Sequence, residues 1–557
     1  MGTNYFTKKL IALLLLIFSP YLALSQEKAS TRFVIIADRA GGEEKGVFDN
    51  LLKQVNTLSP DFVMSIGDII DGYTADTEYL DKMWKEFTEI KEHNLNAPFY
   101  PVPGNHDISN QLMANKWQKQ WGYQYKSMMV NNDMFWLLNT EEGYDGRISE
   151  TQIQYFEKAL KDYNQDGWIY IFMHRPLWKY GDNNGYEHIR KLVEGRKKVV
   201  VFSGHEHHYL KRTINGINHY MLSTSGGGNN LRSNSLGEFH HFFFVTMTKD
   251  GPKVSNILYN GIISEDIVNN SNESLVNSLR DDSWINVCPT LLSHTHQDSV
   301  ELKIQIHSRI PENIKLTCTF PEYKSLQFKF PTLITNITPG ESSISQTIYN
   351  QGIDLMALSP MNIKIDLEAY GTNNEKIVTS FEKQCFFDTQ HECSSQENWI
   401  NCEKPYYIKE DWDWHGIKDG TFSFSLSHNP KHFILKLKYK DDKDICKISP
   451  EMLQDKFFIE FTDLEQNNLT QKITIVNAKA YDEKYNEIKN IRINKEKEEL
   501  LIQIPQKELF IKNTFNFNIG FMDHDNELNQ KPSILWWRPI KNAPNYSSLF
   551  GNFVITK

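Results

Sequence analysis

The stretch Gly204-His205-Glu206-His207 decides the fold class of the first half of this 557-residue chain. It follows the apolar run Val199–Phe202, which is typical of a buried strand. The two histidines alternate at strand spacing, so both imidazoles face one side. Open α/β sheets present their ligand-binding residues at the carboxyl ends of strands. The stretch therefore predicts a pair of metal ligands, His205 and His207, at the edge of an α/β sheet.

Four more apolar runs deliver polar residues in the same way. Asp38 follows Phe33–Ala37, Gly67-Asp68 follows Phe62–Ile66, Gly104-Asn105-His106-Asp107 follows Phe99–Val102, and His174 follows Ile169–Met173. These strand ends bring carboxylates, an amide and imidazoles to one crevice, and such donors suit one or two divalent metals. A pair of metal ions can catalyse phosphoryl transfer to water.

Apolar strands alternate with helical patterns over residues 30–262, which predicts one α/β domain. The clearest helices are Val47–Leu58 and Tyr79–Glu92, whose apolar residues recur at helical spacing. Beyond a polar, Asn/Ser-rich boundary, apolar and polar residues alternate at period two. This pattern predicts two all-β sandwich domains, over residues 284–388 and 398–557.

The N-terminus predicts export. Lys8-Lys9, the apolar run Leu10–Phe18 and the small-residue site Ala23-Leu24-Ser25 are the parts of a signal peptide, over residues 1–25. We expect a periplasmic or extracellular protein with no transmembrane segment after signal removal; an uncleaved N-terminal anchor is the alternative. All six cysteines lie in the second half, where an exported chain permits disulfides in fifteen pairings.

The net charge of -10 argues against a protein that binds nucleic acid through the phosphate backbone.

The motifs Gly67-Asp68, Gly104-Asn105-His106-Asp107 and Gly204-His205-Glu206-His207 resemble the GD, GNHD and GHxH blocks of the calcineurin-like metallophosphoesterase superfamily. His174 matches the isolated metal histidine of that family. The resemblance covers about residues 32–262 and implies an αββα sandwich that binds two divalent metals, with Mn, Fe or Zn as the expected ions. By this resemblance Asp68 bridges both metals. The remaining ligands are Asn105, His174 and His205 for one metal, and Asp38 and His207 for the other.

The resemblance also implies the chemistry. A hydroxide held between the metals would attack phosphorus in line. His106 would lie over the leaving-group oxygen as proton donor or phosphate ligand, with Asp107 orienting it.

The first block departs from the family pattern Asp-x-His, because here it is Asp38-Arg39-Ala40. Ala40 cannot bind metal, so Asp71 or water would complete the second metal site, and occupancy of that site stays open. Arg39 is expected to contact a substrate phosphate oxygen, as a catalytic and substrate-binding residue; an ordinary ion pair is the alternative.

The C-terminal segments Glu410–Gly420 and Phe521–Pro539 resemble the edges of a family-9-type carbohydrate-binding β-sandwich. Their tryptophans would stack on sugar rings, and their Asp and Asn oxygens would hold Ca²⁺. In the alternative interpretation the sandwich is structural and the tryptophans belong to its core.

The sequence as a whole predicts an exported metal-dependent phosphoesterase that hydrolyses a phosphate monoester or diester. The substrate would be a small phosphoester or a phosphorylated glycan. The alternative is a catalytically weak homologue that binds glycans. Metal content and turnover of a nitrophenyl phosphate and its bis-ester would separate these hypotheses.

Overall fold

The structure is a computed structural model that describes residues 30–144, 146–402, 407–409, 420–441, 445, 447, 449–463, 470–509, 511, 513–524, 533–538 and 551–556. The predicted signal peptide over residues 1–25 lies outside the described residues. Within the described residues, we find no helix with the length and apolar character needed to cross a membrane. The chain divides into two compact units, of which the first takes residues up to 72 and 76–270, and the second takes residues 73–75 and those from 271 onward.

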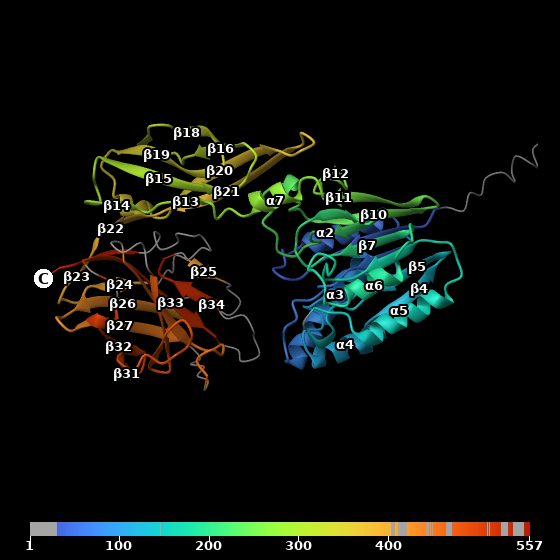
Figure 1. The fold of residues 1–557 in the computed structure, drawn as a ribbon, viewed down its shortest axis with the longest axis horizontal. Helices are drawn as coiled ribbons and strands as arrows, with labels where there is room; N and C mark the ends of the chain where they lie inside the picture. The colour runs from blue at the N-terminus through green and yellow to red at the C-terminus, as the bar shows by residue number, and fades with distance from the viewer. Residues whose placement is uncertain are drawn as a thin grey trace, which may run out of the picture. The chain divides into compact units, whose positions relative to one another are not determined.

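Among its described residues, the first unit contains two six-stranded sheets and five α-helices that pack on them (Figure 1). Its elements are β1 (Arg32–Ile36), α2 (Val47–Thr57), β2 (Phe62–Ser65), α3 (Thr77–Asn94), β3 (Phe99–Pro101), α4 (Gln111–Trp121), β4 (Lys126–Val130), β5 (Asp133–Leu137), α5 (Glu150–Asp162), β6 (Ile169–Phe172), α6 (Tyr186–Leu192), β7 (Val199–Ser203), β8 (Leu210–Ile214), β9 (Ile217–Met221), β10 (His241–Thr248), β11 (Gly251–Leu258) and β12 (Gly261–Ile263).

The two sheets meet face to face through aromatic side chains. Phe33 of β1 lies 5.5 Å from Phe135 of β5 and 6.3 Å from Phe172 of β6, measured between ring centroids. Helices α2, α3 and α4 pack on the outer face of the first sheet, and α5 and α6 on that of the second. This is the αββα sandwich that the sequence predicted, and the prediction is confirmed.

Parallel pairing brings the functional loops together. The first sheet runs β12-β11-β10-β1-β2-β3, with β1, β2 and β3 parallel. The second runs β4-β5-β6-β7-β9-β8, with β5, β6, β7 and β9 parallel. Because parallel strands end at the same edge, the polar residues after β1, β2, β3, β6 and β7 meet at one edge of the sandwich.

The predicted helices are present, with ends set by local capping. The helix expected over Val47–Leu58 is α2. The helix expected over Tyr79–Glu92 is α3, which begins two residues earlier because the Asp76 carboxylate accepts hydrogen bonds from the Glu78 and Tyr79 N–H groups.

Among its described residues, the second unit contains α7 (Glu273–Arg280), short 3-10 helices at Leu355–Leu358 and Gln506–Glu508, and strands that form sheets. Its first strands are β13 (Ile285–Val287), β14 (Thr290–Leu292), β15 (Ser299–Ser308), β16 (Ile314–Thr319), β17 (Leu326–Phe328), β18 (Thr332–Ile337), β19 (Gly340–Asn350), β20 (Met361–Tyr370), β21 (Lys376–Cys385) and β22 (Phe387–Thr389). They form the four-stranded sheets β13-β15-β19-β17 and β18-β16-β20-β21, and the pair β14-β22. Burial alternates along β15 and β20, as period-two patterning predicts.

The later strands are β23 (His391–Cys393), β24 (Trp399–Asn401), β25 (Tyr407–Lys409), β26 (Gly420–His428), β27 (His432–Asp441), β28 (Lys456–Asp463), β29 (Thr470–Val476), β30 (Lys479–Tyr481), β31 (Arg492–Glu496), β32 (Glu499–Pro505), β33 (Thr514–Asp523), β34 (Ser533–Trp536) and β35 (Gly551–Ile555). They form an eight-stranded and a five-stranded sheet around one apolar core, as expected of a β-sandwich. Cys288, Cys318, Cys385, Cys393 and Cys402 are free thiols.

Candidate metal centre

The candidate ligands project from the loops after β1, β2, β3, β6 and β7. The backbone is left-handed at four of them, with φ of 47° at Asp38, 53° at Asp68, 78° at His205 and 53° at His207. Such conformations are uncommon outside glycine, and they gather at functional sites where the surrounding structure holds them. The loops therefore fix these side chains against the residues' own preference.

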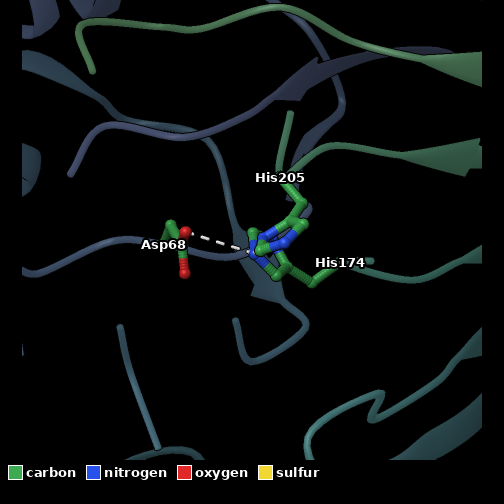
Figure 2. Close-up of side chains that lie close together, drawn as sticks. All are labelled: Asp68, His174 and His205. Carbon is green, nitrogen blue, oxygen red and sulfur yellow. Dashed lines mark hydrogen bonds and ion pairs between the residues drawn. The ribbon is translucent and has the colours of Figure 1, made fainter. Parts of the chain in front are cut away.

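One group of donors contains Asp68, His174 and His205, whose ligand atoms lie within 4.8 Å of one another (Figure 2). His174 Nε2 lies 3.2 Å from Asp68 Oδ2 and 3.1 Å from His205 Nδ1. Asn105 joins this group, because its Oδ1 atom lies 2.9 Å from the same nitrogen. The structure thus brings together the four residues predicted around one metal.

A second group contains Asp38, Asp68 and His207, also within 4.8 Å. His207 Nε2 lies 3.6 Å from Asp38 Oδ1, which also accepts a hydrogen bond of 2.9 Å from the His205 N–H group. Asp68 belongs to both groups. Its carboxylate therefore lies where a single residue can serve two ions, as the sequence predicted.

Backbone carbonyls orient two of the imidazoles. His174 Nδ1 lies 2.8 Å from the Ile66 oxygen, and His207 Nδ1 lies 2.6 Å from the Gly228 oxygen. A carbonyl only accepts, so Nδ1 of each ring carries a proton and donates it. In the neutral ring Nε2 then carries no proton, and it faces a carboxylate of the ligand groups. Metal-binding histidines are held in this way.

Two glycines leave the space that the carboxylates occupy. A Cβ atom on Gly104 would lie 2.2 Å from Asp68 Oδ1, and one on Gly204 would lie 2.3 Å from Asp38 Oδ2. Both distances are far inside van der Waals contact. The glycines of the Gly-Asn-His-Asp and Gly-His-Glu-His stretches are therefore required by the packing of the ligands themselves.

Asp38 and Asp68 are each 1% exposed. Burial raises the pKa of Asp38 well above its ordinary value, although His174 opposes the shift. Burial acts on Asp68 too, but His174 and His106 outweigh it and hold the pKa of Asp68 below its ordinary value. Asp38 Oδ2 has no hydrogen-bond partner among the described residues. An unsatisfied buried carboxylate is costly, and the donor set around it fits a divalent cation.

The surroundings of the three histidine ligands shift their pKa values in different directions. Burial lowers the pKa of His205 to about 2 and also lowers the pKa of His207, so both rings are neutral, the form that binds metal. Burial lowers the pKa of His174 as well, but Asp68 outweighs it and raises that pKa to about 10. A cation bound by Asp68 would take the place of that proton.

His106 lies beside the second group. Its backbone N–H group donates to Asp68 Oδ1 at 3.0 Å, and its ring Nδ1 atom lies 2.6 Å from the Asp71 carbonyl oxygen. Its Nε2 atom lies 3.3 Å from the position a Gly41 Cβ would take, and His207 Nε2 lies 3.4 Å from that position. The two nitrogens therefore border one space, which Gly41 keeps open.

Asp107 was predicted to orient the His106 ring, and the structure gives that contact to the Asp71 carbonyl instead. The Asp107 carboxylate is buried and accepts from the N–H groups of Gly104 at 2.9 Å and Ile69 at 2.9 Å. Burial, then the charge of Asp68, raises the pKa of Asp107 to about 7. Asp107 thus joins the loops after β2 and β3, and it positions His106 through the backbone.

Arg39 is 4% exposed, and its side chain contacts residues outside the two donor groups. Its guanidinium pairs with Glu43 at 2.9 Å and Glu86 at 3.1 Å, and donates to the Ile69 carbonyl at 3.0 Å. It also lies over the Phe48 ring, 5.5 Å from the centroid. These contacts match the ion-pair interpretation of Arg39, and we assign it no contact with substrate.

Asp71, the candidate replacement for the missing histidine, belongs to none of the donor groups found among the described residues. Its Oδ1 atom lies 3.4 Å from the Gly41 nitrogen, at the exposed rim. Ala40 is buried, and its N–H group donates to the Asp68 carbonyl at 2.9 Å.

Two charged residues near the ligands were not predicted. Arg175 follows the ligand His174, and its Nη1 atom lies 3.1 Å from His205 Nε2. Glu141, in the loop after β5, accepts from Arg175 Nε at 2.7 Å. The available signal was that Asn139-Thr140-Glu141 follows the apolar run Met134–Leu138, as the ligands follow theirs.

Residues 31–209 match the family model described as calcineurin-like phosphoesterase. This segment is a calcineurin-like phosphoesterase domain. The ordered motifs and the αββα sandwich predicted from the sequence are those of this domain. The match ends at residue 209, so the second unit lies outside it.

Two curated relatives share part of the chain. A probable glycerophosphodiester phosphodiesterase of Arcobacter nitrofigilis is 28% identical over 165 residues, which are 28% of this chain and 56% of the relative. A serine/threonine-protein phosphatase of Bos taurus is 26% identical over 220 residues, 34% of this chain and 68% of the relative. The chain thus spans about half the length of the first relative and two thirds of the second.

Two solved structures are more distant. A dimetal phosphatase from Danio rerio is 15% identical, with 42% of this chain and 98% of that chain covered, at a TM-score of 0.33. A family 9 carbohydrate-binding module from Caldicellulosiruptor kristjanssonii, in complex with cellotriose, is 11% identical, with 30% and 93% covered, at a TM-score of 0.24.

Carbohydrate binding by the second unit therefore stays a prediction. Two of its candidate tryptophans, Trp536 and Trp537, are buried, and Trp537 packs 5.0 Å from Phe424 in the core. For these two the structural interpretation holds. The segment 410–419, with its further tryptophans, lies outside the described residues. Three carboxylates, from Asp441, Asp455 and Asp523, come within 4.8 Å of one another.

Proposed function

We propose that this protein is an exported metal-dependent phosphoesterase that hydrolyses a phosphate monoester or diester. The observation that carries the proposal is the pair of donor groups that share Asp68 and have His106 beside them. The calcineurin-like phosphoesterase match over residues 31–209 supports the same reaction class. Bound divalent metals would supply a nucleophile from water near neutral pH and neutralise charge on the phosphoryl oxygens.

The residues of this chain would hold the substrate and move the proton. His106 is fixed through its Nδ1 contact with the Asp71 carbonyl, so its Nε2 atom faces the space beside Gly41. A proton on that nitrogen would pass to the leaving-group oxygen. Asp107 keeps the supporting loops in register through the Gly104 and Ile69 N–H groups.

The curated relatives are named a phosphodiesterase and a phosphatase, so both ester classes belong in the test. We propose to strip the purified protein with chelator, reload it with Mn²⁺, Zn²⁺ or Fe²⁺, and measure metal content. Turnover of p-nitrophenyl phosphate and of its bis-ester would then be compared between wild type and Asp68→Asn. Asp166→Asn is the matched control, because the Asp166 side chain is 96% exposed.

We expect metal-dependent turnover of at least one ester by wild type and by the control, and none by Asp68→Asn. Protein that holds two metals and turns over neither ester would contradict the proposal. That result would favour the alternative of a catalytically weak, glycan-binding homologue. Export is tested separately by sequencing the N-terminus of secreted protein, which should begin at Gln26.

A further inference from the structure

A guanidinium lies directly beside the metal-ligand cluster. Arg175 Nη1 is 3.1 Å from His205 Nε2, on the side of the ring opposite the Nδ1 atom that meets His174. The Arg175 side chain is 23% exposed, so it is shielded but still reaches solvent. It lies in the loop after β6, next in sequence to the ligand His174.

This guanidinium is firmly anchored. Glu141 is 2% exposed, and its Oε1 atom accepts from Arg175 Nε at 2.7 Å. The Arg175 N–H group donates to Thr140 Oγ1 at 3.1 Å, and Thr140 Oγ1 lies 3.0 Å from the same Glu141 oxygen. Because the Glu141 partner is buried and these hydrogen bonds are made, the pair restricts the guanidinium to a narrow range of positions. Because Glu141 takes the Nε edge, the Nη end of the fork is directed to His205.

The anchor is itself built into the fold. The Glu141 N–H group donates to Asn139 Oδ1 at 2.8 Å. The Asn139 backbone exchanges two hydrogen bonds of 2.9 Å with the Gln152 side chain on α5. The loop after β5 is therefore fixed to α5, and it places Glu141 at the same sheet edge as the ligands.

Arg39 differs from Arg175 in its surroundings and in its exposure to solvent. Its guanidinium pairs with two carboxylates and lies on the Phe48 ring, and it is 4% exposed. Arg175 adjoins a metal ligand and keeps part of its surface open. The cation that the first sequence block was expected to offer to phosphate is therefore better supplied from the loop after β6.

We propose that Arg175 binds a non-bridging oxygen of the substrate's phosphoryl group, and that Glu141 positions it for this. The inference rests on the proposed phosphoesterase function. A guanidinium fork matches phosphate oxygens better than a point charge does. A pre-positioned cation also stabilises the charge that spreads over these oxygens during transfer. The ligand class is a tetrahedral phosphate, either as the ester or as the released inorganic ion.

A purely structural role is the competing explanation, since Arg175 joins the loops after β5 and β6. The two roles predict different changes in the measured quantities. Loss of a structural contact lowers thermal stability and metal retention. Loss of a phosphate contact weakens phosphate binding while stability and metal content persist.

We would measure binding of inorganic phosphate to the full, metal-loaded chain by calorimetry, in wild type, Arg175→Lys, Arg175→Gln and Glu141→Gln. Metal content and Tm would be recorded on the same samples. Arg190→Gln is the matched control, because Arg190 is an exposed arginine on α6 that has no place in the site. Adding guanidinium ion to Arg175→Gln tests chemical rescue.

We expect Arg175→Gln to raise the Kd for phosphate by about 10- to 100-fold, the range of one hydrogen bond between charged groups. Arg175→Lys should keep part of the affinity, Glu141→Gln should lose less than Arg175→Gln, and the control should match wild type. KM for the ester should rise with the Kd. An Arg175→Gln protein with two metals and unchanged phosphate affinity would overturn the inference. So would a loss of affinity that only accompanies loss of metal.

The two proposals fail separately. Arg175-dependent phosphate binding by a protein without turnover would remove the phosphoesterase proposal and leave the binding role of Arg175. Turnover and phosphate affinity that are both unchanged in Arg175→Gln would remove the binding role of Arg175 and leave the phosphoesterase proposal.

Discussion

The substitution Gly204→Ala tests the geometry of the site with one added methyl group. Gly204 follows β7, and its N–H group donates to the His174 carbonyl at 2.8 Å. Its φ lies outside the left-handed range, so the backbone accepts alanine. The new Cβ would lie 2.3 Å from Asp38 Oδ2, 3.3 Å from Asp38 Cγ and 3.4 Å from Ile66 Cδ1. The conflict is therefore with the Asp38 carboxylate.

The required movement is large for a metal ligand. Real Cβ contacts essentially never fall below 3.0 Å, so the oxygen must retreat by at least 0.7 Å from its 2.3 Å separation. Asp38 cannot turn freely, because its other oxygen accepts from the His205 N–H group at 2.9 Å. A displacement of about 1 Å in a reacting constellation costs on the order of 10²-fold in rate. We expect kcat/KM to fall by about that factor, with one of two metals held weakly.

The assay compares Gly204→Ala with Gly261→Ala, because a Cβ on Gly261 would meet nothing within 4 Å. Metal content is measured by mass spectrometry at a fixed free metal concentration, and kcat/KM with p-nitrophenyl phosphate or its bis-ester. Gly261→Ala should match wild type in both. A Gly204→Ala enzyme with two tight metals and wild-type kcat/KM would refute the packing argument and our placement of Asp38 as a ligand.

Three further predictions concern other parts of the chain. Asp68→Ala should lose both metals, because its carboxylate belongs to both donor groups, and elemental analysis showing one retained metal would exclude the bridging role. His106→Gln should keep both metals and lower kcat by about 10²–10⁴-fold, with His188→Gln as an exposed control; loss of metal would show a ligand role instead. In the second unit, burial raises the pKa of Glu460 to about 7, although Lys472 opposes the shift. A carboxyl with a raised folded pKa contributes stability that is full below the unfolded value of 4.5 and is lost as pH rises through about 7. Glu460→Gln should remove that decline, by up to about 3 kcal/mol, in unfolding measurements at pH 5 and pH 8; an unchanged slope would contradict the assignment.

The sequence was sufficient to predict the ligand cluster because two local rules agree. Apolar runs of four or five residues mark buried parallel strands, and the residues that follow them must meet at one edge. Asp68, His174 and His205 come from three separate loops, yet their ligand atoms lie within 4.8 Å. Strand order did not have to be known for this, because every parallel strand of both sheets delivers its end to the same side.

Side-chain direction within the loops was not predictable in the same way. Arg39 lies between the ligand Asp38 and Ala40, but its guanidinium pairs with Glu86, 47 residues further along the chain. The His106 ring is held by a carbonyl, not by the neighbouring Asp107. The left-handed backbone at Asp38 and Asp68 was not predictable either, because residue type alone does not indicate it.

In the second unit, period-two alternation predicts strands but not their partners. Strand β23 pairs in parallel with β35, with Glu392 opposite Val554. Strand β24 instead pairs with β26, close in sequence. Alternation fixes which face of each strand is buried, whereas the choice between near and distant partners depends on the whole sheet.

The first block explains why the two donor groups differ. Ala40 stands where the family has a histidine, and its N–H group donates to the Asp68 carbonyl at 2.9 Å, so this position ties the loop after β1 to the loop after β2. Gly41 follows with φ of 79°, and a Cβ there would lie 3.0 Å from the His207 ring. The block thus holds Asp38 in place through its backbone contacts. Among the described residues, Asp38, Asp68 and His207 would then serve one ion, while Asp68, Asn105, His174 and His205 would serve the other. The first of these ions needs more water in its shell, and it is the one that we expect to dissociate first.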